Sequence, residues 1–208
     1  MENKRQDKNV KRRFNTRNLA MIGMLGAISA VLMLLNTAVP FVPTFIKIDL
    51  SELPIILGAF MMGPLSGLMI ILVKIVLHLV MSGTDSMFVG EFANVVGSVS
   101  YMIPAVLIYK KIRTKKGAVL SMAVGTIVTS VISVISNTFF VFPAYAKVYG
   151  MPMDAIISMG TAVNPSIHDL FTMMLYSVLP FNIFKFALVS IITFFVYKKI
   201  EKLVKSFK

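Results

Sequence analysis

Apolar residues fall into six runs that are separated by shorter polar segments. The runs cover residues 19–36, 52–62, 65–82, 88–109, 118–142 and 176–197. Five of them reach the roughly 18 apolar residues that cross a bilayer as an α-helix. The pattern therefore predicts an all-α integral membrane protein.

The second run, which reads LPIILGAFMM, is the ambiguous one. Such a short helix crosses a core of about 30 Å with difficulty, because an α-helix rises only about 1.5 Å per residue. The run either merges with the third across Gly63-Pro64, a pair that breaks helices, or forms a separate short and tilted helix. Hydrophobicity alone does not decide between the two.

Basic residues decide it, because 17 of the 21 lie in three blocks that each adjoin an apolar run. The blocks are residues 1–18, residues 110–116 and the C-terminal tail from residue 198. This is the positive-inside pattern, and two cytoplasmic blocks must be separated by an even number of crossings. We therefore expect six transmembrane helices with both termini cytoplasmic and with residues 37–51, 83–87 and 143–175 outside. The blocks adjoin membrane segments and can meet anionic lipid, so nucleic-acid binding is not expected.

Composition agrees with one membrane domain. Hydrophobic residues make up 57% of the 208 residues and charged residues 14%, against about 25% charged in soluble domains. We expect a basic cytoplasmic segment at 1–18, a six-helix transmembrane domain at 19–200 and a basic cytoplasmic tail at 201–208. A full-length apolar run follows the basic N-terminal segment, so a cleavable signal peptide is not expected. The absence of cysteine excludes disulfides and thiolate metal sites.

Polar residues inside the apolar runs share one depth. Counted from the outer helix ends, they lie roughly 5–10 Å below the outer rim. They are Lys74, His78, Glu91, Asn94, Asn137, Asn182 and Lys185. Each has an ordinary alternative role, since a lysine can extend to the headgroups and an asparagine can bridge helices. Together they predict a water-accessible cavity that opens to the outside, in which Lys74 pairs with Glu91 to lower the cost of burial.

The surroundings of this layer favour a small organic ligand. Apolar walls with a few convergent polar groups are typical of small-molecule sites, and a flat, uncharged, hydroxyl-bearing ligand suits amides and ammonium groups. Nearby phenylalanines either stack on such a ligand or face lipid and other helices. They are Phe139, Phe140, Phe142, Phe181 and Phe184.

Two outer loops are substantial. In the first, Ile46, Ile48 and Leu50 alternate with polar residues, which favours an extended segment, and Asp49 with Glu52 is spaced to cap the following helix. The second, residues 143–175, has helical potential near 153–162. It contains His168-Asp169, which we interpret as surface residues because the sequence places no nucleophile beside them.

Three stretches carry a family resemblance: FIKIDLSELPIILGAFMMGPLSGLMIILVKIVLHLV, GEFANVVG and PFNIFKF. They resemble the substrate-binding (S) components of energy-coupling-factor (ECF) vitamin transporters, in particular the riboflavin-binding branch. The likeness extends from LAMIGMLGAISAVL to the basic tail. It implies a six-helix protein of the bacterial cell membrane that captures riboflavin from outside.

The resemblance also implies roles for individual residues. Asn182 and Lys185 contact the vitamin from the last helix, Asn137 does so from the fifth, and Glu91 with Asn94 lines the cavity. The first outer loop closes over the ligand through residues Thr44, Phe45, Ile46 and Lys47. With Lys74 from the polar layer, these residues form the expected ligand-binding site, and no resident cofactor or metal is expected. Gly23 and Ala27 face a coupling subunit, although the family often has alanine where this chain has Gly23.

A capture subunit of this kind depends on a transmembrane coupling (T) subunit and a pair of ATP-binding cassette ATPases. The chain itself contains no G-x-x-x-x-G-K-[ST] phosphate loop, which agrees with that dependence. We therefore expect a binding subunit and not an enzyme. An S component for another vitamin and an unrelated secondary transporter remain alternatives, and the sequence leaves open whether riboflavin 5′-phosphate is also bound.

Overall fold

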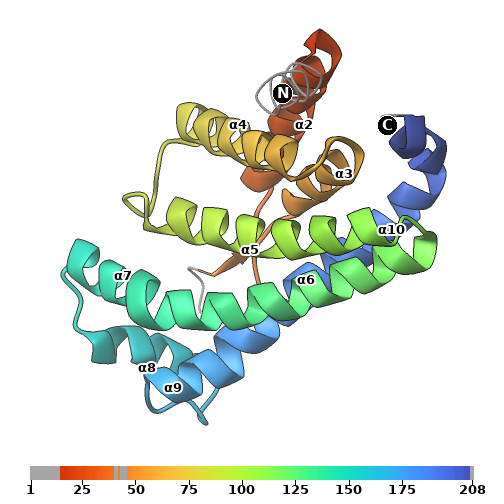
Figure 1. The fold of residues 1–208 in the computed structure, drawn as a ribbon. Coiled ribbons are helices and arrows are strands. Elements are labelled where there is room, and N and C mark those ends of the chain that lie inside the picture. The colour runs from red at the N-terminus through yellow and green to blue at the C-terminus, as the bar shows by residue number, and fades with distance from the viewer. Residues whose placement is uncertain (1–14, 40–41, 43–45, 207–208) are drawn as a thin grey trace, which may run out of the picture.

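The computed structural model describes residues 15–39, 42 and 46–206, and within these ranges the chain is a bundle of helices with a short hairpin (Figure 1). The α-helices are α2 (Thr16–Leu34), α3 (Glu52–Met62), α4 (Pro64–Ser82), α5 (Val89–Lys111), α6 (Lys115–Ser136), α7 (Phe142–Tyr149), α8 (Met153–Val163), α9 (Leu170–Met173) and α10 (Leu179–Ser206). Two π-helical segments are η1 (Asn137–Val141) and η2 (Met174–Val178). Strands β1 (Thr37–Ala38) and β2 (Lys47–Ile48) pair antiparallel.

Within the part of the chain that the structure describes, five helical segments are long and apolar enough to cross a membrane. They are Thr16–Leu34, Pro64–Ser82, Val89–Lys111, Lys115–Tyr149 and Leu170–Tyr197. Helix α3 has only 11 residues. The chain breaks between α3 and α4 at Gly63, whose φ of 100° favours glycine, and Pro64 begins α4. The second and third apolar runs are therefore separate helices, as predicted.

Two of the long segments are continuous through a π-helical turn. Helix α6 runs through η1 into α7, so the helix that we expected to end at residue 142 continues to Tyr149. Segment η2 joins α9 to α10 in the same way. The two π segments contact each other. The predicted helix near 153–162 is confirmed as α8.

The apolar core lies between α2, α3, α4, α5, α6 and α10. It is centred on fully buried side chains such as Ile55, Met102 and Val189, and it includes three tyrosines. The hydroxyl groups of Tyr109 and Tyr197 lie 2.6 Å apart, so one donates to the other. The outward surface is also apolar, as expected for helices that face lipid. Val80, for example, is 78% exposed.

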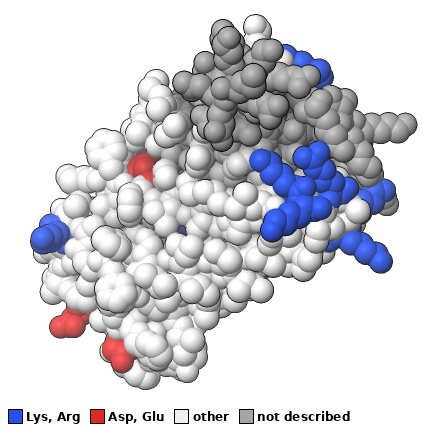
Figure 2. Space-filling model, viewed as in Figure 1, with Lys and Arg blue, Asp and Glu red and all other residues white. Residues whose placement is uncertain are grey.

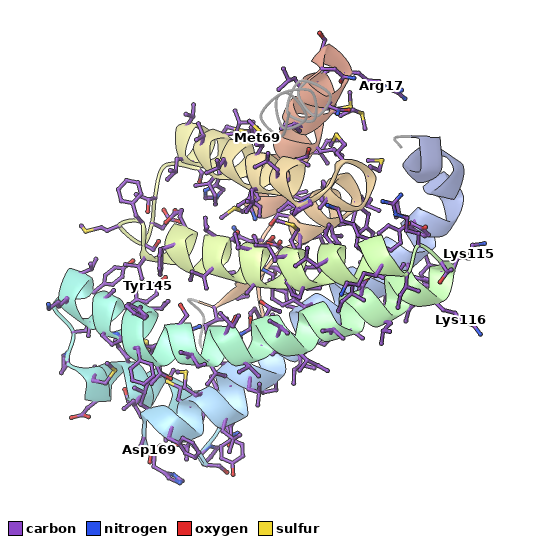
Figure 3. The ribbon with its side chains drawn as sticks, viewed as in Figure 1. Arg17, Met69, Lys115, Lys116, Tyr145 and Asp169 are labelled. Atoms are coloured by element: carbon purple, nitrogen blue, oxygen red, sulfur yellow. The ribbon has the colours of Figure 1, made fainter. Side chains whose placement is uncertain are left out.

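Charged side chains differ between the two ends of the bundle. Lys115 and Lys116 lie where α5 meets α6, on the side of the C-terminus, whereas Asp169 lies at the α8–α9 end (Figure 3). On the face shown in Figure 2, most Lys and Arg side chains gather at the first end and acidic side chains lie toward the other. The long helices α5, α6 and α10 connect the two ends (Figure 1).

Candidate ligand-binding site

A cavity of about 490 Å³ lies between the end of α2, the β2–α3 segment and helices α4, α5, α6, α7, α8 and α10. Its volume is within the range of small-molecule sites. The predicted polar layer surrounds it: His78, Glu91, Asn94, Asn137, Asn182 and Lys185 all line the cavity. Ile46 and Lys47 of the first loop line it too, whereas Thr44 and Phe45 lie outside the described residues.

Lys185 reaches the cavity wall from α10 and forms an ion pair there with Asp49. Its Nζ lies 2.9 Å from Asp49 Oδ2, and both side chains are buried. Burial by itself raises the pKa of Asp49, but the ammonium groups of Lys185 and Lys74 and a hydrogen bond from Ser51 outweigh it and lower the pKa to about 2. The pair therefore ties the segment before α3 to α10.

The expected cap of α3 by Asp49 and Glu52 takes a different form. Asp49 Oδ1 accepts a hydrogen bond from the backbone N–H of Ser51 at 2.9 Å, and Ser51 is the N-cap residue. Ser51 makes no capping hydrogen bond with its own side chain. Glu52 begins the helix and points its carboxylate at Lys74 instead, so the spacing predicted the helix start but not the partners.

Lys74 lies behind the cavity wall, and two predictions about it are wrong. The side chain is completely buried and does not line the cavity, and it pairs with Glu52 at 3.2 Å and not with Glu91. Its Nζ also donates to Asn94 Oδ1 at 2.6 Å, to Ser98 Oγ at 2.9 Å and to Ser51 Oγ at 3.3 Å. An ammonium group has three hydrogens to donate, so these protein groups occupy all of them and leave none for a ligand.

Three asparagines in the wall are held by hydrogen bonds to other parts of the bundle. Asn94 Oδ1 accepts from Lys74 Nζ at 2.6 Å and from Ser98 Oγ at 3.5 Å. Asn137 Nδ2 donates to the Ser133 carbonyl at 2.7 Å, and Asn182 Nδ2 donates to the Val178 carbonyl at 2.8 Å. Each bond fixes an amide and leaves its other polar atom for a ligand. Asn94 thus has its amino group available, whereas Asn137 and Asn182 have their carbonyl oxygens.

The aromatic part of the wall differs from the expected one. Phe181 lines the cavity, but Phe139, Phe140 and Phe184 are 68%, 63% and 47% exposed and face outward. Phe142 is buried in a separate apolar cluster with Ile156. The remaining aromatic wall residues are Tyr145, Tyr149 and Phe186.

Sequence reasoning missed three groups of wall residues. The first is Asp49 with Glu52, which we assigned to a loop and to a helix cap. The second is Tyr145 with Tyr149, which are spaced i,i+4 on α7 and whose rings stack with centroids 5.7 Å apart. The third is the apolar side of α8 and the turn before it, with Met151, Ile156 and Met159. The i,i+4 tyrosines were a visible signal, but the segment was read as a loop.

The loop pair His168-Asp169 has a structural role. Asp169 is the N-cap of α9 and forms a capping box with Thr172, whose backbone N–H donates to Asp169 Oδ1 at 2.7 Å. This hydrogen bond lowers the pKa of Asp169. The carboxylate therefore starts the helix that leads into η2.

Comparison with known proteins decides the family. The model of the ECF transporter substrate-specific component matches residues 17–197. The chain belongs to this family of S components. It is 30% identical over 91% of its length to the riboflavin transporter RibU of Staphylococcus aureus, of which the match covers 93%. It is 29% identical over 89% of its length to the riboflavin transporter FmnP of Bacillus subtilis, of which the match covers 92%.

A solved structure of the S component of a bacterial ECF transporter has the same fold. It is 31% identical in sequence, it superposes with a TM-score of 0.71, and the match covers 91% of this chain and 98% of that chain. This chain is thus the substrate-specific component of a family of membrane transporters.

Small residues on α2 of this S component form two strips with different surroundings. Gly23 and Ala27 are exposed, and a Cβ at Gly23 would meet nothing within 4 Å. Gly26 and Ala30 are buried, and a Cβ at Gly26 would clash with the side chain of Val73 of α4. The Gly26/Ala30 strip is therefore part of the bundle, and the Gly23/Ala27 strip is not covered by the described residues.

Proposed function

We propose that this S component captures riboflavin in the cavity between α4, α5, α6 and α10. The observation that carries the proposal is the convergence of Asn94, Asn137, Asn182 and the Lys185–Asp49 pair on one cavity that also has aromatic walls. Amide and ammonium groups can bind the carbonyls and hydroxyls of a flavin, and the aromatic rings can contact its flat ring system. Two relatives that match this chain over about 90% of its length are named riboflavin transporters.

Fluorescence tests this proposal directly, because flavin emission is quenched when the ring is held in a protein. Purified protein in detergent is titrated into riboflavin, with thiamine and biotin as competitors. We expect saturable quenching that neither competitor reverses, and yellow protein after extraction from riboflavin-fed cells. Quenching that is absent, or reversed by another vitamin, would assign the cavity to a different solute.

We further propose that the chain crosses the membrane six times, with both termini in the cytoplasm and the cavity facing outside. Three features support this: α3 is a separate helix, the basic residues lie at the α5–α6 end, and the cavity is lined by the connections at the other end. Because the chain has no native cysteine, single cysteines can be labelled without background. Lys115→Cys should be protected from an impermeant thiol reagent in intact cells, and Asp169→Cys should react. The reverse labelling pattern would show that the protein has the opposite orientation in the membrane.

The exposed strip of Gly23 and Ala27 is the proposed docking face for a coupling subunit, which works with a pair of ATPases. Small residues let another helix approach closely, and close packing drives helix association in lipid. Gly23→Leu and Ala27→Leu should therefore preserve riboflavin binding and abolish uptake and co-purification of the partner. Met24→Leu, at an exposed site next to the strip, is the matched control. Loss of riboflavin binding in both strip variants would show that the strip supports the bundle itself.

A further inference from the structure

Most of the charge in the cavity wall is neutralised in pairs. The charged residues that line the cavity are Lys47, Asp49, Glu52, Asp85, Glu91 and Lys185. Asp49 is paired with Lys185 at 2.9 Å, and Glu52 with Lys74 behind the wall at 3.2 Å. Lys47 and Asp85 are exposed and have opposite charges, so their formal charges sum to zero. Glu91 remains, and it is buried.

Among the described residues, hydroxyl groups and not a cation hold the Glu91 carboxylate. Oε2 of Glu91 lies 3.1 Å from Thr84 Oγ1 and 2.9 Å from Ser86 Oγ. Thr84 Oγ1 already accepts from the backbone N–H of Phe88 at 2.9 Å, and Ser86 Oγ accepts from that of Gly90 at 2.9 Å. Both hydroxyl groups therefore donate their hydrogens to the Glu91 carboxylate, which accepts both hydrogen bonds. Its negative charge is stabilised in this way but is not cancelled.

The loop before α5 is built to hold this arrangement. Met87 and Phe88 have φ values of 45° and 70°, which cost energy for residues other than glycine and cluster at functional sites. The loop also occupies N–H groups at the start of α5: those of Phe88 and Gly90 bind the two hydroxyls, and that of Val89 binds the Ser86 carbonyl. These three N–H groups at the start of α5 are therefore bound within the loop itself and are not available to a bound anion.

We propose that Glu91 makes the cavity selective for an uncharged flavin and against its anionic 5′-phosphate ester. The inference rests on the proposed function, because it takes a flavin as the occupant. Among the described residues, an anion in the cavity meets the negative charge of Glu91, whereas the ammonium groups of Lys185 and Lys74 are already paired with carboxylates. Glu91 is thus a specificity-determining residue, and its repulsion acts on the phosphate but not on riboflavin.

The test compares riboflavin with riboflavin 5′-phosphate by fluorescence quenching for the unmodified protein, Glu91→Gln and Asp154→Asn. Glutamine keeps the shape and the acceptor oxygen that binds Thr84 and Ser86. Asp154 is exposed on α8 and does not line the cavity, so its variant removes the same charge elsewhere. Two like charges about 10 Å apart at an effective dielectric constant near 20 change affinity roughly tenfold. We expect the unmodified protein to prefer riboflavin by at least about that factor, and Glu91→Gln alone to remove most of the preference.

A second measurement does not depend on the variant folding. Raising the salt concentration should strengthen binding of the phosphate ester to the unmodified protein and leave riboflavin binding unchanged, because salt screens repulsion. Equal affinity for both flavins in the unmodified protein, or an unchanged ratio in a folded Glu91→Gln protein, would overturn the inference while leaving riboflavin capture intact. Failure of the unmodified protein to bind riboflavin would overturn the proposed function itself.

Discussion

The two ends of the bundle are stabilised by different kinds of contact. At the α5–α6 end, apolar side chains fill the space between helices, and the buried hydroxyls of Tyr109 and Tyr197 bind each other. At the cavity end, charged and amide groups face inward, while Phe139 and Phe140 face outward. Two ion pairs connect the segment at Asp49–Glu52 to α10 and to α4. The first end can hold the fold, so the second can keep an open cavity.

Substitution of Lys74 should have the largest effect and tests this division most directly. Lys74 lies at the cavity end, behind the wall, yet its ion pair stabilises the fold. Lys74→Met leaves the Glu52 carboxylate buried without its cation, and breaking a buried pair in this way costs about 3–5 kcal/mol. We expect a large drop in the melting temperature of the purified protein in detergent. Thermal unfolding followed by tryptophan-free methods, such as circular dichroism, measures it, since the chain contains no tryptophan.

The double variant Lys74→Met/Glu52→Gln is the control for this prediction. It removes both charges at once, so much of the lost stability should return. If Lys74→Met alone melts like the unmodified protein, the Lys74–Glu52 pair does not stabilise the fold. The fold would then depend on the apolar end alone, and the two ends would be more separate than their contacts suggest.

Asn137 and Asn182 should show the opposite behaviour, with an effect on binding and little on stability. Each offers a ligand its carbonyl oxygen, and each lost hydrogen bond is worth about 0.5–1.5 kcal/mol, or more if a buried ligand group stays unpaired. Asn137→Ala and Asn182→Ala should therefore weaken riboflavin binding several-fold to about a hundredfold. The fluorescence titration measures this, with Asn164→Ala as control, since Asn164 does not line the cavity. Unchanged affinity in both variants would make these amides interhelical contacts only.

The sequence predicted the helices and the residues of the cavity wall better than it predicted the direction in which each side chain points. Hydrophobic runs predicted the long helices, and the polar layer predicted a shared cavity, whose wall contains His78, Glu91, Asn94, Asn137, Asn182 and Lys185. Depth along a helix does not give rotation about its axis. For this reason Lys74 was placed in the wall although α4 turns it toward Glu52 and Ser98.

The hydrophobic pattern also did not predict that α6 continues through η1 into α7 and that α9 continues through η2 into α10. The π-helical turns at Asn137–Val141 and Met174–Val178 contact each other, and hydrophobic periodicity does not distinguish such turns from α-helix. They lie where α6 and α10 pass the cavity, and π turns are frequent at functional sites. The wall of α7 and α8 was missed because residues 143–175 are rich in glycine, proline and methionine and were read mainly as a loop.

Tyr109 gives the smallest expected effect and tests whether the apolar end is independent of the cavity. Tyr109→Phe keeps the ring that stacks on Phe60 with centroids 4.2 Å apart, but it removes the hydroxyl that binds Tyr197. One hydrogen bond is worth about 0.5–1.5 kcal/mol, so the melting temperature should fall slightly. Riboflavin affinity should stay unchanged, because neither tyrosine lines the cavity. Tyr197→Phe and the double variant complete a cycle in which the second substitution costs less than the first. If Tyr109→Phe instead weakens binding as much as Asn182→Ala does, packing at the far end controls the cavity and the two ends act as one unit.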